Sequence, residues 1–167
     1  MRIEDRLLFL KYALPCAGAF IRRGNVSQGY VDGLIKMVAE GNVPAERAET
    51  MFKVADAQCE AIATKEGKSS IDSDVIREYF LVEHSRVVDD RFELMRDFDP
   101  VACKTYVGVV RSIGSESAVV ETRLGKGHYK TLFARGVKVG DKVITHYDFV
   151  IEKVSADAAK WLQKVKQ

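Results

Sequence analysis

The spacing of hydrophobic residues changes near residue 100. Before that point apolar residues recur every three or four positions, which indicates amphipathic helices. After it, short runs of β-branched and aromatic residues alternate with glycine-containing turns, which is typical of strands. We therefore predict an α+β protein with an N-terminal all-α helical domain over 1–98. A small closed, OB-like β-barrel with a terminal helix is predicted over 101–167, and DFDP at 97–100 is the linker.

The first hundred residues contain several helix start and stop signals. Ser27 is a candidate N-cap for one helix, and Pro44 is placed to begin a long helix that Gly67 ends. Ser70 or Asp72 is expected to cap a further helix that continues to about Met95. The apolar residues of this last helix fall near one face, with breaks. The predicted helices cover 3–14, 17–23, 28–40, 44–66 and 73–95.

The strand-like runs after Pro100 are short enough to form a small barrel. Closure would remove the unpaired edges that such strands otherwise expose. The run Gly125–His128 is predicted to be a turn between strands, and Ser155 is expected to cap the terminal helix, whose apolar face includes Val165. The predicted strands lie within 104–113, 117–124, 129–134 and 137–154.

Charge divides the chain at the same boundary. The net charge is +2, but residues 1–100 hold fourteen Lys or Arg against eighteen Asp or Glu. Residues 101–167 hold twelve against six and are therefore basic. A basic module attracts nucleic acid or an acidic protein surface, and it can equally dock on the acidic helical half of its own chain.

Composition excludes several classes of protein. The apolar runs are far too short to span a bilayer, and the start of the chain lacks the basic segment of a secretory signal. We therefore expect a cytoplasmic protein with no membrane partner. Three cysteines without a CxxC pair indicate free thiols. The chain contains no catalytic triad, HExxH, phosphate loop or dinucleotide fingerprint, so we do not predict an enzyme.

The barrel segment has two ordered motifs. The first is Cys103-Lys-Thr-Tyr-Val-Gly108 followed by valines, and the second is Gly140-Asp141-Lys-Val-Ile-Thr-His146 followed by aromatic and apolar residues and a helix. In this order and spacing they resemble the HypC-type hydrogenase-maturation chaperones, over about 65 residues. Nothing comparable is recognised in residues 1–100.

The resemblance implies a ligand role for Cys103 toward a transient iron unit and a supporting role for His146. A thiolate is a soft ligand suited to such iron, and a nearby imidazole holds a proton or a hydrogen bond. The predicted function is thus a non-enzymatic accessory or protein-interaction module related to metal-centre maturation. A protein partner follows from this prediction, and residues 1–98 are a candidate surface for that partner or for a homo-oligomer.

Two alternatives stay open. In the first, a small barrel binds nucleic acid through a basic face that includes Arg123, Lys126, Lys130 and Arg135. In the second, the protein is a structural interaction module in which Cys103 has no chemistry. For the other polar candidates the structural interpretation is favoured. Cys16 and Cys59 are expected in apolar helical cores, and His84 is expected on a solvated helix face, since the position four residues later is Val88.

Overall fold

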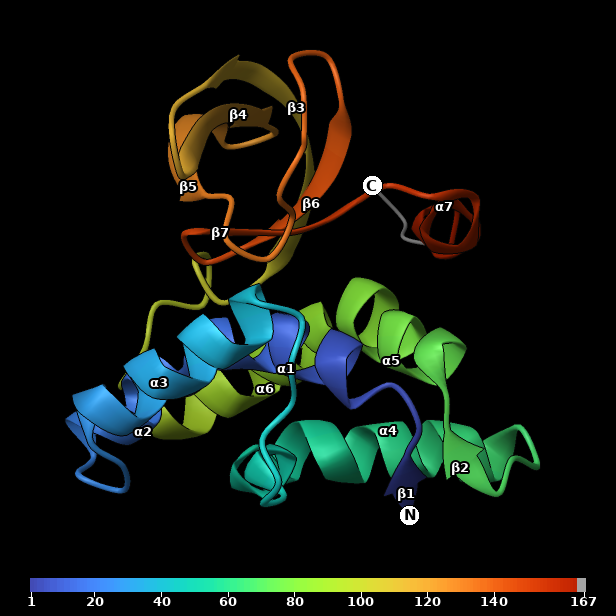
Figure 1. The fold of residues 1–167 in the computed structure, drawn as a ribbon. Helices are drawn as coiled ribbons and strands as arrows, with labels where there is room; N and C mark the ends of the chain where they lie inside the picture. Colours follow the sequence, from blue (N-terminus) through green and yellow to red (C-terminus); the bar gives the residue numbers. More distant parts are fainter. Residues whose placement is uncertain (165–167) are drawn as a thin grey trace.

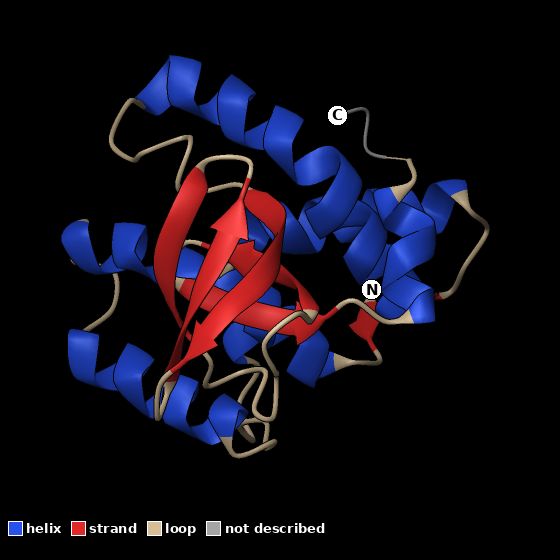
Figure 2. Cartoon of the chain, turned by 90° about the horizontal axis from the view of Figure 1, so that it is seen from above, coloured by secondary structure: helices blue, strands red, loops and turns tan. Residues whose placement is uncertain are grey.

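A computed structural model of the chain describes residues 1–164 and has a layer of helices beneath a five-stranded sheet (Figure 1). Seen from above, the strands lie over the helices (Figure 2). The α+β class, with helices first and strands after, is confirmed. Val165, expected on the last helix, lies outside the described residues. The helices are α1 (Arg6–Ala13), α2 (Ala17–Arg22), α3 (Gln28–Ala39), α4 (Lys53–Lys65), α5 (Ser73–Glu78), α6 (His84–Met95) and α7 (Ala156–Leu162).

Shorter helical segments and two small strands complete the helical half. Two segments are 3-10 helices, η1 (Leu14–Cys16) and η2 (Ala48–Met51), and η3 (Tyr79–Glu83) is a π-helix between α5 and α6. The strands β1 (Arg2–Ile3) and β2 (Ser70–Ile71) pair in parallel. Among the described residues, no helix combines the length and the apolar character needed to cross a bilayer.

Side-chain caps set several helix starts as the sequence predicts. Ser27 accepts a hydrogen bond from the Tyr30 amide, and Asp72 accepts one from the Val75 amide. Ser155 caps α7 in the same way through the Ala158 amide. These caps satisfy amides that the first helical turn leaves without backbone partners.

The prediction of a long helix starting at Pro44 was wrong, because α4 starts only at Lys53. The Arg6 guanidinium accounts for the difference. It donates to the Pro44 and Glu46 carbonyls at 3.0 and 2.8 Å, and to the buried Glu49 carboxylate at 2.6 Å. Those carbonyls are therefore used by a side chain from α1, and the chain makes only the short turn η2 before α4.

The barrel strands are β3 (Thr105–Ile113), β4 (Ser117–Thr122), β5 (Gly125–Lys130), β6 (Lys142–His146) and β7 (Phe149–Lys153). They are hydrogen-bonded in the order β3-β4-β5-β7-β6, and β6 pairs again with β3, so the sheet closes on itself. The only parallel contact among them joins Lys130 of β5 to Phe149 of β7 within the described residues.

The prediction of a turn at Gly125–His128 was also wrong, since these residues belong to β5. Thr122 and Gly125 face each other across the hairpin, so the turn is Arg123-Leu124. The Thr122 hydroxyl accepts a hydrogen bond from the Leu124 amide at 3.1 Å, which stabilises this earlier turn. The residues predicted as strand at 131–134 lie in the loop between β5 and β6.

The two motif glycines serve different purposes. A Cβ on Gly108 would overlap the Val120 side chain and lie 2.9 Å from the Glu121 carbonyl oxygen, so β3 and β4 approach too closely for any side chain. Gly140 has φ +92°, a conformation that favours glycine, and it places Asp141 at the start of the last hairpin.

The hydrophobic core crosses the boundary between the two halves. Its largest cluster contains helical residues such as Phe9 and Phe80 together with Ile144, Phe149 and Ile151 of the barrel. A second cluster lies inside the barrel alone and consists of Val110, Ala118, Val120, Val143 and Val150. The barrel therefore has its own small core and also rests on the core of the helices.

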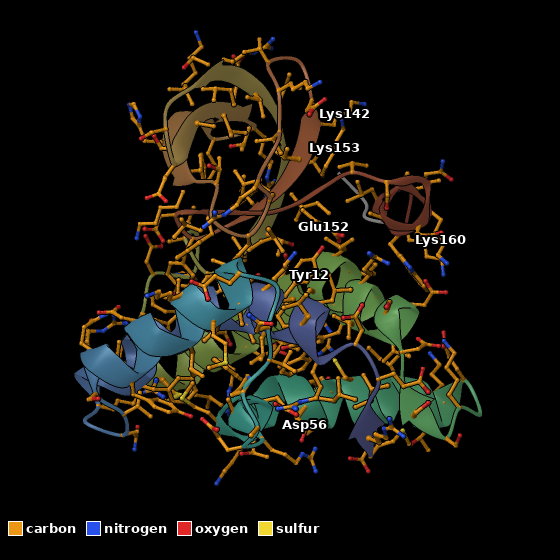
Figure 3. The ribbon with its side chains drawn as sticks, in the orientation of Figure 1. Tyr12, Asp56, Lys142, Glu152, Lys153 and Lys160 are labelled. Atoms are coloured by element: carbon orange, nitrogen blue, oxygen red, sulfur yellow. The ribbon has the colours of Figure 1, made fainter. Side chains whose placement is uncertain are left out.

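A polar network fixes the barrel on the helices at Glu152 (Figure 3). The Tyr12 hydroxyl donates to the Glu152 carboxylate at 2.6 Å, and Arg77 donates to both carboxylate oxygens at 3.0 Å. Burial, with the nearby Glu152 charge, raises the pKa of Tyr12 well above its usual value, so its hydroxyl keeps the proton that it donates. In this largely buried pair of Arg77 and Glu152 the acid belongs to the barrel, although the barrel half as a whole is basic.

In two ion pairs nearer the surface the basic residue belongs to the barrel half and the acidic residue to the helical half, as the sequence suggests. Lys104 of the barrel half pairs with Asp89 of α6 at 2.7 Å, and Lys160 of α7 pairs with Asp74 of α5 at 2.7 Å. Some of the basic charge of residues 101–164 thus meets acidic charge of the helical half.

Replacing Arg77 by Met should lower the free energy of unfolding by about 2–3 kcal/mol, because it leaves the Glu152 carboxylate without its cation. Only 13% of the Arg77 side chain and 15% of the Glu152 side chain are exposed. The matched control is Lys104→Met, which breaks a pair whose acid is 57% exposed and should cost less than about 1 kcal/mol. Urea unfolding followed by circular dichroism measures both, and equal losses would contradict the expectation.

Candidate metal centre

Four polar side chains converge where the helices meet the barrel. Cys16 ends η1, His84 begins α6, Cys103 lies in the turn before β3, and His146 ends β6. One sulfur or nitrogen from each lies within 4.8 Å of the others. Cys16 is half-buried and the other three are buried. Each half of the protein therefore supplies one thiol and one imidazole.

The π-helix η3 places His84 in this cluster. The His84 amide donates to the Tyr79 carbonyl, five residues earlier, so the turn holds one more residue than an α-helical turn. Residues after this turn are rotated relative to a regular helix, and His84, Val87 and Val88 become buried. The Thr105 hydroxyl of β3 donates to the Phe80 carbonyl inside the segment at 2.8 Å. The breaks in the predicted apolar stripe have this origin.

Asp99 shapes the turn that carries Cys103. Its carboxylate accepts hydrogen bonds from the Val101 and Ala102 amides at 2.8 and 3.3 Å. The Asp99 carbonyl accepts a hydrogen bond from the Cys103 amide at 3.0 Å. The turn is joined to the last hairpin because the Tyr147 amide donates to the Ala102 carbonyl at 3.2 Å. Cys103 is thus held beside the end of β6.

Tyr12 sets the orientation of His146. The His146 Nδ1 atom lies 2.8 Å from the Tyr12 carbonyl oxygen, which only accepts, so Nδ1 carries the proton. The other nitrogen, Nε2, then presents a lone pair and lies 3.4 Å from the Cys16 sulfur. Metal-binding histidines commonly use a carbonyl in this way to fix the ring.

Tyr147 follows in a left-handed conformation, with φ +51°. A bulky residue rarely adopts this backbone conformation, which is commoner near functional sites. Here it forms the two-residue turn between β6 and β7, and the Tyr147 ring centroid lies 5.5 Å from that of His146. The turn therefore keeps an aromatic ring against the cluster.

The two thiols differ in acidity. The Cys16 thiol is a hydrogen-bond partner of the Cys103 sulfur at 3.8 Å, which lowers the pKa of Cys103, and the two imidazoles lower it further. The same hydrogen bond, with burial, raises the pKa of Cys16. Burial lowers the pKa of His84, so its ring is neutral. The cluster without metal therefore favours one thiolate, at Cys103, beside a neutral His84 ring.

Two distances within the cluster match those of a tetrahedral metal site. Zinc–sulfur bonds of about 2.3 Å and zinc–nitrogen bonds of about 2.0 Å at tetrahedral angles place sulfurs about 3.8 Å apart, and sulfur and nitrogen about 3.5 Å apart. The Cys16 and Cys103 sulfurs are 3.8 Å apart, and Cys16 sulfur and His146 Nε2 are 3.4 Å apart. His84 Nδ1 is buried with no hydrogen-bond partner among the described residues, so this ring has coordination capacity that the protein leaves unused.

A cavity of about 920 Å³ borders the cluster. Cys16, His84 and Cys103 line it, whereas His146 does not. The rest of its wall comes from α2, the region of η2 and the start of α4, and α6. The cluster is therefore closed on the barrel side and accessible from the helical side.

Of the residues that the sequence singled out for binding, Cys103 and His146 meet in this cluster. Cys59 is fully buried in the helical core, as expected, and burial raises its pKa. Comparison with protein-family models and with curated proteins finds no match to this chain. The resemblance to HypC-type chaperones remains a prediction from the two barrel motifs.

The four predicted basic residues do not lie together on one strand. Lys126 and Lys130 point to solvent from β5, whereas Arg123 lies in the preceding turn and Arg135 in the loop after β5. Acidic groups are interspersed with them. Lys130 pairs with Asp148 at 2.8 Å, and Lys126 lies opposite Glu121 in the register of β4 and β5.

Two members of the cluster were assigned wrongly from the sequence. Cys16 was expected in an apolar core, but its sulfur contacts Cys103 and His146. His84 was expected on a solvated face, but only 5% of it is exposed. The ligands are spread from position 16 to 146, so no local ligand spacing exists. The one available signal was the set of breaks in the apolar stripe of the helix predicted over 73–95.

Replacing Thr105 by Val should lower the free energy of unfolding by about 1 kcal/mol, because the Phe80 carbonyl inside the π-helix loses its hydroxyl donor. Thr64→Val is the matched control. The Thr64 hydroxyl donates to the Glu60 carbonyl on an exposed part of α4, and its loss should change stability by less than about 0.5 kcal/mol. Urea unfolding distinguishes the two, and an unchanged midpoint for Thr105→Val would contradict the role given to this bond.

Proposed function

We propose that this protein is a non-enzymatic, metal-binding accessory protein whose metal is held by Cys16, His84, Cys103 and His146. The observation that carries the proposal is the placement of four ligand atoms within 4.8 Å of one another. Two thiols and two imidazoles gathered in this way form a donor set typical of zinc or of iron bound to sulfur.

The charge of this donor set favours a divalent ion. Two thiolates and two neutral imidazoles together carry charge −2, which a divalent cation neutralises. A neutral site suits surroundings that contain Phe80, whose ring centroid lies 5.4 Å from that of His84 and 6.3 Å from that of His146. An unpaired charge in such a place would be costly. Binding would release the proton of Cys16, because both ligands must be thiolates.

The position of the site suggests what the metal does for the protein. Two ligands come from the helices and two from the barrel half, so a bound ion would join the halves in addition to the Glu152 network. Because the ligands form one site only when the barrel is seated, metal binding and docking of the halves should be coupled.

The resemblance of residues 101–167 to HypC-type chaperones supports a role in metal-centre maturation. It implies that Cys103 is a soft ligand for a transient iron unit, with His146 in support. The cluster is consistent with that role and adds Cys16 and His84 as two further ligands. Under this proposal the metal is cargo for a partner protein.

Metal-free protein should bind one equivalent of Co²⁺ with the intense sulfur-to-metal charge-transfer absorption of a thiolate site. Zn²⁺ should displace the cobalt. Since loss of an outer partner of a metal site costs 10–100-fold in affinity, loss of a direct ligand in Cys16→Ser, His84→Gln, Cys103→Ser or His146→Gln should cost at least about a hundredfold. Competition with a chelator measures these affinities.

Cys59→Ala is the matched control for the cobalt titration, because Cys59 is a buried thiol outside the cluster. It should keep the wild-type cobalt spectrum. Far-ultraviolet circular dichroism of each variant checks that the fold is retained. Cobalt binding without charge-transfer absorption, or with equal affinity in Cys103→Ser, would refute the proposed site.

Alkylation provides a second test. In metal-free folded protein, iodoacetamide should modify Cys103 first, because its thiolate is favoured and it borders the cavity. Cys59 should react only after unfolding, because it is fully buried and burial raises its pKa. Zn²⁺ should protect both Cys16 and Cys103. Peptide mass spectrometry over time measures the three rates, and a Cys103 rate as slow as that of Cys59 would count against the role.

A further inference from the structure

The cavity beside the cluster has the size and lining of a small-molecule site. Its volume of about 920 Å³ falls within the usual range of ligand pockets, and apolar side chains form most of its wall. The walls are built by helices and loops between positions 13 and 98, with Cys103 and Tyr147 added from the barrel side. The larger apolar side chains along it are Phe20, Met51, Phe52, Val87, Met95 and Phe98.

The metal ligands differ in how they face this space. His146 does not line the cavity, and its ring is fixed by the Tyr12 carbonyl. His84 and Cys103 line it but are buried. Cys16 lines it and is the one half-buried ligand of the four. A molecule that enters the cavity therefore meets Cys16 at the most accessible position of the metal site.

We infer that the cavity binds a thiol carried on an apolar body, and that this thiol replaces Cys16 on the metal. The inference rests on the metal site proposed above. A tetrahedral ion with four protein ligands has no vacant position, so an incoming donor must take the place of one of them. Exchange of one thiolate for another keeps both the softness of the donor set and its neutral total charge.

The exchange balances without an oxidant or a further reactant. The bond between the metal and the Cys16 sulfur breaks, and a bond between the metal and the sulfur of the incoming thiol forms. The proton of that thiol passes to the Cys16 thiolate, which becomes a neutral thiol in the cavity wall. Cys103, His84 and His146 remain bound, so the ion stays on the protein with its new ligand.

The cavity wall selects the body of the ligand. Burying an aromatic or aliphatic group against Phe20 and Phe52 removes apolar surface from water, which a small polar thiol cannot do. Ala19 lines the cavity three residues after Cys16, about one helical turn away. A large side chain at this position would fill the space beside Cys16 without changing a ligand.

The test uses full-length protein loaded with Co²⁺ and titrated with benzenethiol or with 2-mercaptoethanol. Benzenethiol should change the charge-transfer absorption at a concentration at least about tenfold lower than 2-mercaptoethanol. Ala19→Trp should remove most of this preference. Ala61→Trp, an exposed position on α4 that does not line the cavity, should leave it unchanged. Ala19→Leu is a milder substitution should the tryptophan variant not fold.

The Cys16→Ser variant tests whether the incoming thiol replaces the Cys16 thiolate on the metal. With the Cys16 thiolate absent, benzenethiol has no protein thiolate to displace and should bind more tightly than to the wild type. The spectrum before thiol addition shows whether cobalt is bound, so failure of the metal site is seen separately. Cobalt binding with no response to benzenethiol, or an equal response in Ala19→Trp and wild type, would overturn the inference. A rise in free cobalt would also overturn it, because the ion should stay bound.

Discussion

Tyr12 of α1 holds the two halves of the protein in one register. Its carbonyl accepts the Nδ1 proton of His146, and its hydroxyl donates to Glu152, so both barrel strands β6 and β7 are tied to the same residue. Arg77 neutralises Glu152 in this largely buried place. Without that register the thiol and imidazole of the barrel half would not meet Cys16 and His84. The candidate metal centre thus depends on how the barrel is seated.

The cluster also illustrates how a polar site is accommodated in an apolar junction. Isolated thiolates and imidazolium ions are costly to bury, and the metal-free cluster limits the cost by favouring a single thiolate at Cys103 beside a neutral His84 ring. A divalent ion bound to both thiolates and both imidazoles would remove the remaining charge. Cys16 is only half-buried and lines the adjoining cavity, so this site is accessible from one side.

The π-helix connects backbone geometry to this chemistry. A regular α-helix from Ser73 to Met95 would keep one apolar face throughout, and the turn at Tyr79–Glu83 shifts that face by about one residue. The shift buries His84 within the cluster. The Thr105 hydroxyl of β3 donates a hydrogen bond to the Phe80 carbonyl in the same turn. A π-turn is retained where a functional or packing need outweighs its cost, and here it positions a side chain of the candidate metal centre.

The sequence by itself determined most of the element types, the caps at Ser27, Asp72 and Ser155 and the change from helices to strands, because these depend on local spacing and on side chains a few residues apart. It also pointed to Cys103 and His146, which stand in ordered motifs. Tertiary structure alone decided that Cys16 and His84 join them, since their neighbours come from distant parts of the chain. It likewise decided the late start of α4, which follows from the Arg6 guanidinium binding carbonyls some forty residues away. Local patterns do not encode such contacts, because they join residues far apart in the sequence and arise only when the helices pack on one another and on the barrel.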